Sequence, residues 1–225
     1  MGKNKLQRFE ENQTFKHLVQ PTRREMLDNF ELKGKWNESF FRNQNPIVLE
    51  LGCGKGEYTL GLSRNYPDKN FIGIDLKGAR LWRGAKTVEL ENIQNVGFLR
   101  TQIELIDYAF AESEISEIWI TFPDPQIKFK RKIHRLTHPE FLERYKKILQ
   151  PNGFIHLKTD SEFLHGYTSG IIEANSYKTL ISNHDIYNTS THDLPEYLYS
   201  IQTHYEKMFL KEGKMITYLK FQLES

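Results

Sequence analysis

The chain has 225 residues, of which 38% are hydrophobic, 27% are charged and 13% are aromatic. This length suits one α/β domain with an extension, and no apolar run approaches the length of a membrane span. The formal net charge of +2 at pH 7 does not by itself indicate a nucleic-acid-binding protein. The N-terminus lacks an apolar signal segment, and the single cysteine, Cys53, cannot form an intramolecular disulfide, so we expect a cytoplasmic protein.

Residues 1–45 show no clear hydrophobic period, and we interpret them as a basic, partly helical extension before one domain at 46–225. In that domain short apolar runs alternate with helical patterns, which is typical of a mainly parallel Rossmann-like sheet with helices on both faces. Seven strands are predicted, at 47–51, 70–75, 96–100, 115–122, 153–159, roughly 177–182, and 215–222. Helices are predicted at 57–65, 78–91, 139–149 and 162–173. The tight connection at 211–214 predicts that the last strand is antiparallel.

A glycine-rich turn follows the first predicted strand. Gly52, Gly54 and Gly56 occupy alternate positions, where residues without a Cβ let the backbone take a positive φ and approach a ligand. The spacing excludes a P-loop and disfavours a dinucleotide fingerprint, because position 57 is Glu57. The second predicted strand ends at Asp75, where Rossmann-like folds bind ribose hydroxyls. Two alternatives stay open: the glycines form only a tight turn, and Asp75 caps the following helix.

Polar residues fall at or just beyond the ends of five predicted strands. The five segments are the glycine turn and the positions of Asp75, Gln102, Asp124 and Asp160. Ligands of open α/β sheets bind outside the carboxyl ends of the strands, near the point where the strand order reverses. We therefore expect these five segments to converge on one edge of the sheet.

The fourth predicted strand leads into a loop in which Pro123 and Pro125 fix the backbone on either side of Asp124. This loop presents one carboxylate, although an Asx-turn is an alternative role for it. A run of cations without an acid follows, and we expect Lys130, Arg131, Lys132 and Arg135 of this run to contact RNA phosphates unless it is a solvated loop. The run contains Lys128, Lys130, Arg131, Lys132 and Arg135. No metal site is expected, because the histidine pair at 134 and 138 lacks the glutamate of a metal-binding helix.

Two patterns resemble known families. The run E-x-G-x-G-x-G from Glu50 to Gly56, with Asp75 at the end of the next strand, resembles motif I of the class I S-adenosylmethionine-dependent methyltransferases. The segment F-P-D-P-x-x-K at 122–128, the T-D pair at 159–160 and T-H-Y-E at 203–206 are similar to the signature of the bacterial tRNA (guanine-N(7)-)-methyltransferase family. This resemblance extends from residue 46 to the C-terminus.

The resemblance implies a class I methyltransferase fold, S-adenosylmethionine as cofactor and tRNA as partner. The implied reaction methylates N7 of the guanine at position 46 of the tRNA variable loop. The implied catalytic residue is Asp124, and the implied cofactor-binding residues are Glu50, Gly52, Gly54, Gly56, Asp75, Gln102 and Asp124. The implied substrate-binding residues are Lys128, Asp160, Thr203, His204, Tyr205 and Glu206.

The implied chemistry is mostly alignment, because N7 of neutral guanine already carries a lone pair and needs no base to deprotonate it. We expect Asp124 to accept hydrogen bonds from the guanine edge that carries N1–H and the 2-amino group. Two positions depart from the family pattern: Gln126 replaces a tryptophan, and Gln102 replaces an aspartate at the adenine contact. The amide oxygen of Gln102 remains able to accept from the adenine amino group.

Several alternatives stay open. Asp160 is also placed to cap the next helix, and Thr203 and Glu206 to cap or brace the last hairpin. A methyltransferase for an exocyclic amine and a catalytically idle RNA-binding subunit are the rival functions. The sequence is compatible with a monomer or a homodimer.

Overall fold

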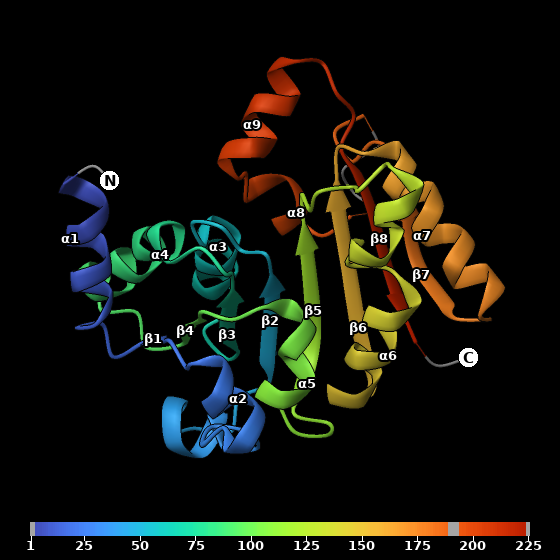
Figure 1. Ribbon diagram of the computed structural model, residues 1–225. Helices are drawn as coiled ribbons and strands as arrows, with labels where there is room; N and C mark the ends of the chain where they lie inside the picture. The colour runs from blue at the N-terminus through green and yellow to red at the C-terminus, as the bar shows by residue number, and fades with distance from the viewer. Residues whose placement is uncertain (1–2, 189–193, 224–225) are drawn as a thin grey trace.

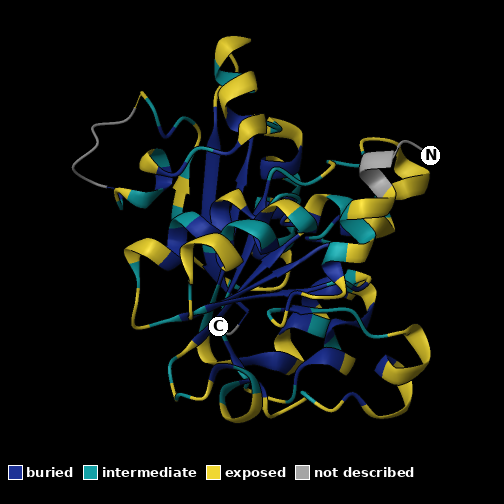
Figure 2. Ribbon diagram, turned by 90° about the vertical axis from the view of Figure 1, so that its left-hand side faces the viewer, coloured by how far each residue is buried: buried dark blue, intermediate teal, exposed yellow. Residues whose placement is uncertain are grey.

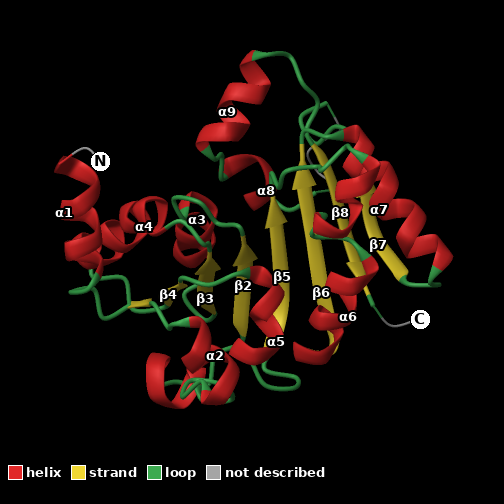
Figure 3. Cartoon of the chain, in the orientation of Figure 1, coloured by secondary structure: helices red, strands yellow, loops and turns green. Residues whose placement is uncertain are grey.

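One twisted sheet with helices on both faces organises the chain, as Figures 1 and 3 show. The computed structural model describes residues 3–188 and 194–223, and in these ranges the sheet has eight strands. Their order is β1-β4-β3-β2-β5-β6-β8-β7. Each neighbouring pair is parallel except those of β8, which is antiparallel to both β6 and β7. No helix of the described chain has the length and apolar character needed to cross a bilayer.

The strands are β1 Leu18–Val19, β2 Ile47–Leu51, β3 Asn70–Ile74, β4 Val96–Leu99, β5 Ile115–Thr121, β6 Leu149–Thr159, β7 Lys178–Asn183 and β8 Thr217–Gln222. The α-helices are α1 Lys3–Asn12, α2 Arg23–Asn29, α3 Glu57–Asn65, α4 Gly78–Glu91, α5 Ile106–Ala109, α6 Pro139–Ile148, α7 Glu162–Ala174, α8 Tyr197–Ser200 and α9 His204–Lys211. A π-helical turn, η1, covers Trp36–Phe41, and 3-10 turns cover η2 Ile103–Leu105 and η3 Phe129–His134.

The seven predicted strands and the antiparallel direction of the last one are confirmed. The predicted strand number is one short, because β1 in the N-terminal extension pairs with β4. Strand β6 begins at Leu149, before the predicted start at residue 153, and contains an irregularity near residue 152. Leu149 already pairs with Ile115, and the register against β5 shifts before Phe154 pairs with Glu117. Asn152 takes a positive φ of 62° at this irregularity.

The N-terminal extension packs against the sheet and against helix α4 of the following domain. Helix α1 lies against α4, where Trp82 Nε1 donates to the Glu11 carboxylate at 2.9 Å. Asn12 Nδ2 donates to the carbonyl of Gly78 at 2.9 Å, at the start of α4. Trp36 is fully buried in the core that the sheet shares with α5 and α6. The boundary at residue 45 stays a prediction.

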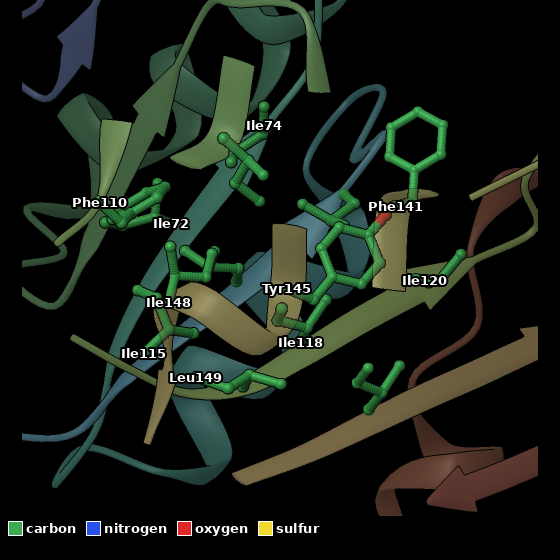
Figure 4. Close-up of a cluster of buried hydrophobic side chains, with 14 of the residues drawn as sticks. Ile72, Ile74, Phe110, Ile115, Ile118, Ile120, Phe141, Tyr145, Ile148 and Leu149 are labelled. Carbon is green, nitrogen blue, oxygen red and sulfur yellow. The ribbon is translucent and has the colours of Figure 1, made fainter. Parts of the chain in front are cut away.

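Alternate residues of the central strands face two cores, because side chains of a strand point to opposite sides. Ile118 and Ile120 of β5 pack with helices α5 and α6, as the cluster in Figure 4 shows. Trp119, between them, faces the other core with Tyr58 of α3. Buried strands therefore run through the middle of the molecule, and exposed positions lie on the outer faces of the helices (Figure 2).

Candidate active site

Two cavities flank the glycine turn at the carboxyl end of the sheet. Strand order reverses here, since β3 and β4 follow on one side of β2, and β5 and β6 on the other. The larger cavity, of about 620 Å³, lies between this turn, the loop after β5 and the start of α9, and its lining includes Glu50, Asp124, Asp160, Thr203 and Tyr205. The smaller, of about 270 Å³, is lined by the loops after β3 and β4, including Asp75, Leu76 and Gln102. Gly52 belongs to both, so the cavities meet at the turn.

The glycine turn is held by backbone hydrogen bonds and is open above. Gly52, Gly54 and Gly56 have φ values of 73°, 58° and 73°, in the left-handed region that favours glycine. The N–H groups of Gly52 and Cys53 both donate to the carbonyl of Ile74, at 2.8 and 3.0 Å. A Cβ added to Gly52 or Gly54 would meet nothing within 4 Å, so space for a ligand lies above them. The tight turn and the ligand socket are therefore compatible interpretations of the same backbone.

Asp75 ties the ends of β2 and β3 together. Its carboxylate accepts from the N–H of Gly54 at 3.0 Å and from the N–H of Lys77 at 2.7 Å. Lys77, not Asp75, is the residue at the N-cap of α4. Each carboxylate oxygen has further acceptor capacity beyond these bonds, and Asp75 lines the smaller cavity.

Glu50 is a buried carboxylate at the base of the larger cavity. Thr121 Oγ1 donates to it at 2.6 Å, and the N–H of Thr59 donates at 2.8 Å, with the Thr59 hydroxyl as a third donor. Burial raises the pKa of Glu50 to about 7, although these three hydrogen bonds oppose the shift. Burial also raises the pKa of the Cys53 thiol well above its usual value, which agrees with a filler role for that side chain.

The loop after β5 carries an exposed Asp124 at the cavity wall. Its Oδ1 accepts from the N–H of Gln126 at 3.0 Å, so the Asx-turn considered from the sequence is present. Gln126 has a positive φ of 47°, and its carbonyl accepts from Arg135 Nη2 at 3.1 Å. The loop conformation thus orients the carboxylate as well as exposing it.

Arg135 anchors this loop from inside the protein, which corrects the prediction that it contacts tRNA phosphates. Its side chain is only 5% exposed, and its guanidinium lies 4.8 and 4.4 Å from the ring centroids of Phe163 and Tyr167. The other predicted phosphate contacts, Lys130, Arg131 and Lys132, stay on the surface of η3, with Lys128 just before them. None of these four has a carboxylate within 4 Å in the described part of the chain.

Some residues of the C-terminal motif at 203–206 line the larger cavity, and one lies in the protein interior. Thr203 caps α9, where its Oγ1 accepts from the N–H of Glu206 at 3.2 Å, and Thr203 and Tyr205 line the larger cavity. His204 is exposed but is not part of the lining. Glu206 is fully buried, so the prediction that it faces the substrate is corrected.

Glu206 forms a buried ion pair instead. Lys158 Nζ of β6 lies 2.7 Å from its carboxylate, and both side chains are 0% exposed. The Tyr187 hydroxyl donates to the same carboxylate at 2.9 Å. Burial lowers the pKa of Lys158, and the facing carboxylate opposes that shift. The pair fixes α9, which stands beyond the carboxyl ends of the central strands in Figure 1 and carries one wall of the cavity.

Asp160 lies in the cavity wall and does not cap the next helix. Its carboxylate accepts from Lys214 Nζ at 2.8 Å, and both residues belong to the lining. Ser161 is the N-cap of α7, and its Oγ accepts from the N–H of Leu164 at 3.2 Å. The carboxylate of Asp160 is therefore available to a ligand together with the ammonium of Lys214.

Gln102 has a partner that sequence patterns did not reveal. Arg23 Nη1, in the extension, donates to its Oε1 at 2.7 Å. One lone pair of the amide oxygen expected to accept from adenine is therefore engaged by Arg23, and its second lone pair and the amide N–H groups of Gln102 are left for a ligand. A capping box between Thr22 and Glu25 starts α2 at Arg23 and places this guanidinium beside the smaller cavity.

Comparisons with known proteins agree with this geometry. A family model described as "Putative methyltransferase" matches residues 44–219. The tRNA (guanine-N(7)-)-methyltransferase of Christiangramia forsetii is 60% identical over 224 residues, 99% of each chain. That of Bacteroides fragilis is 50% identical over 225 residues, 99% of this chain and 87% of the relative. This chain belongs to the tRNA (guanine-N(7)-)-methyltransferase family.

Solved structures of methyltransferases share the fold of this chain, although their sequence identity to it is low. The 16S rRNA methyltransferase KamB superposes with a TM-score of 0.63 at 12% identity, over 84% of this chain and 92% of that one. A SAM-dependent methyltransferase from Aquifex aeolicus superposes with a TM-score of 0.54 at 14% identity, over 98% of both chains. The predicted class I methyltransferase fold is therefore confirmed.

The raised pKa of Glu50 predicts a pH dependence of stability. Because the folded state binds this proton more tightly than the unfolded chain, the contribution of Glu50 to stability is lost as pH rises from about 4.5 through about 7. Glu50→Gln cannot ionise. Relative to wild type, its free energy of unfolding should increase between pH 5 and 8, by at most about 1.4 kcal/mol per pH unit. Urea denaturation at a series of pH values measures this difference, in which the other titrating groups cancel. A difference that is independent of pH would contradict the buried-carboxylate interpretation.

The ion pair of Glu206 predicts a large loss of stability when one partner is removed. Glu206→Ala leaves the Lys158 ammonium buried and unpaired, which should cost about 3–5 kcal/mol of unfolding free energy. Asp160→Ala removes a carboxylate from the partly exposed pair with Lys214 and should cost less than about 1 kcal/mol. Urea denaturation of both variants makes the comparison. Equal costs would show that Glu206 is not held in a buried ion pair.

Proposed function

We propose that this protein transfers a methyl group from S-adenosylmethionine to N7 of a guanine in tRNA, at position 46 of the variable loop. One observation carries the proposal: the glycine turn of a methyl-donor site and the carboxylate of Asp124 line the same cavity. Relatives that carry this activity in their names match almost the full chain. A cytoplasmic location belongs to the same proposal.

The residues around the glycine turn suit S-adenosylmethionine. Asp75 has acceptor capacity for a ribose diol, and Gln102 offers amide N–H groups beside it. Glu50 supplies a carboxylate near the open space above Gly52 and Gly54, on the side of the larger cavity. A cationic ammonium group there would favour the ionised form of Glu50. We assign the adenosine part to the smaller cavity and the amino-acid part to the larger one.

The bound cofactor supplies an electrophilic methyl group on a sulfonium sulfur. The protein needs no general base for the acceptor, because N7 of neutral guanine has an in-plane lone pair. We assign Asp124 to the guanine edge that carries N1–H and the 2-amino group, where a carboxylate accepts hydrogen bonds and offsets positive charge that develops on the ring. The Asx-turn with Gln126 and the anchor at Arg135 hold that carboxylate in place, which lowers the entropic cost of alignment.

The cations in and just before η3 contribute electrostatic free energy to the binding of RNA. Lys128, Lys130 and Arg131 are exposed and unpaired with acids in the described chain, so they are free to neutralise phosphates. Asp160 and Lys214 add one acceptor and one donor group at the cavity wall. We propose that these two groups contact the nucleotide that carries the target guanine.

Asp124→Ala tests the proposal on its central residue. Loss of one group that stabilises developing charge costs about 100- to 1,000-fold in turnover, so methylation should fall by that factor while tRNA affinity changes by less than about threefold. Asp28→Ala, which removes an exposed aspartate outside both cavities, is the matched control. Turnover is measured as label transferred from the methyl donor to tRNA, and nucleoside mass spectrometry identifies the product.

Wild-type protein should place the label in 7-methylguanosine. Label in a base methylated on an exocyclic amine would replace this proposal with the rival methyltransferase. Absence of S-adenosylmethionine binding in calorimetry would indicate an idle RNA-binding subunit. Near-normal turnover of Asp124→Ala would remove the role assigned to Asp124 while leaving the reaction intact.

A further inference from the structure

Two large apolar side chains project into solvent beside the larger cavity. Phe129 is 78% exposed and Ile127 is 68% exposed. Ile127 belongs to the cavity lining, two residues after Pro125, and Phe129 begins η3. Single exposed apolar residues are common on proteins, but these two are close in sequence and lie next to the site of chemistry.

The surroundings of these side chains are cationic. Lys128 separates them in sequence, and Lys130 and Arg131 follow, all three exposed. Lys132 Nζ lies 4.4 Å from the centroid of the Phe129 ring, in a cation–π contact. An aromatic ring among unpaired cations is suited to a partner that carries negative charges and flat apolar groups together. Unpaired nucleotides have both properties.

The segment that carries Ile127 is fixed to the protein body. Arg135, which is buried, donates to the carbonyl of Gln126 at 3.1 Å and to that of Ile127 at 3.5 Å. Its guanidinium is in turn held between Phe163 and Tyr167. Because the backbone is already ordered, docking a partner on these exposed side chains does not require the loop to become ordered first.

We propose that Phe129 and Ile127 form a stacking platform for an unpaired base of tRNA that neighbours the target guanine. The inference rests on the proposed function and adds a substrate contact to it. A guanine that enters the cavity leaves its stack, so the adjacent base loses a stacking partner. The ring of Phe129 replaces that partner, and Ile127, which belongs to the cavity lining, joins the apolar platform to the cavity. The neighbouring cations neutralise the flanking phosphates.

The test distinguishes the contribution of base stacking to tRNA binding from the contribution of charge. Phe129→Ala should raise the KM for tRNA by about tenfold or more, because stacking on an aromatic side chain is lost. It should leave the affinity for S-adenosylhomocysteine and the slope of tRNA affinity against salt concentration unchanged, since no charge is removed. Lys130→Ala should reduce that slope by about one phosphate contact. Phe129→Tyr keeps an aromatic ring and should restore a KM within about twofold of wild type, whereas Phe129→Leu should not.

Leu90→Ala is the matched control, because Leu90 is a similarly exposed apolar residue, at 74%, on α4 and outside both cavities. A direct readout uses tRNA with 2-aminopurine next to the target guanine. Its fluorescence should be quenched by wild-type protein and not by Phe129→Ala.

The outcomes distinguish this inference from the proposed function. If wild type forms 7-methylguanosine but Phe129→Ala and Leu90→Ala have the same KM, the platform is wrong and the reaction stands. If wild type forms no 7-methylguanosine, the proposed function is wrong, and the inference that rests on it is wrong as well. Binding to vesicles of anionic phospholipid that depends on Phe129, with an unchanged KM for tRNA, would assign the patch to a membrane surface and overturn the inference.

Discussion

The hydrogen bonds of the Asp75 carboxylate are the constraint on which the rest of the site depends. By accepting from the N–H groups of Gly54 and Lys77, this side chain joins the glycine turn after β2 to the start of α4 after β3. The turn follows a left-handed path at Gly52, Gly54 and Gly56, which few other residues adopt without strain. The junction lies where the strand order reverses, and Gly52 lines both cavities there.

Buried cations position the parts of the site that the sheet does not reach. Arg135 holds the loop of Asp124 from below, and Lys158 holds α9 through Glu206. Charges removed from water are costly unless they are paired or hydrogen-bonded, as Lys158 is with Glu206 and Arg135 is with the carbonyl of Gln126, so these contacts permit few alternative positions for the loop and the helix. The family motif therefore contains residues of two kinds: some line the cavity, and others fix the elements that line it.

Sequence patterns predicted much of the fold between Ile47 and Ala174, because regular alternation of apolar residues and glycine punctuation determine strands and helices there. They missed β1, whose two residues are too short to show a period, and α9, which Thr203 caps. The spacing of the motifs predicted that acidic residues lie at one edge of the sheet, but it did not indicate which motif residues are buried. Glu206 and Arg135 lie in the interior because their partners, Lys158, Phe163 and Tyr167, come from distant segments. Arg23 was missed for the same reason, since its contact with Gln102 joins the extension to the loop after β4.

The central claim is that both cavities form one site for a methyl donor, and a crystal structure with S-adenosylhomocysteine tests it most directly. The account predicts that the ribose hydroxyls contact Asp75, that the adenine lies beside Gln102, and that the sulfur faces the cavity that holds Asp124. A ligand bound elsewhere, or one whose sulfur points away from Asp124, would contradict the account.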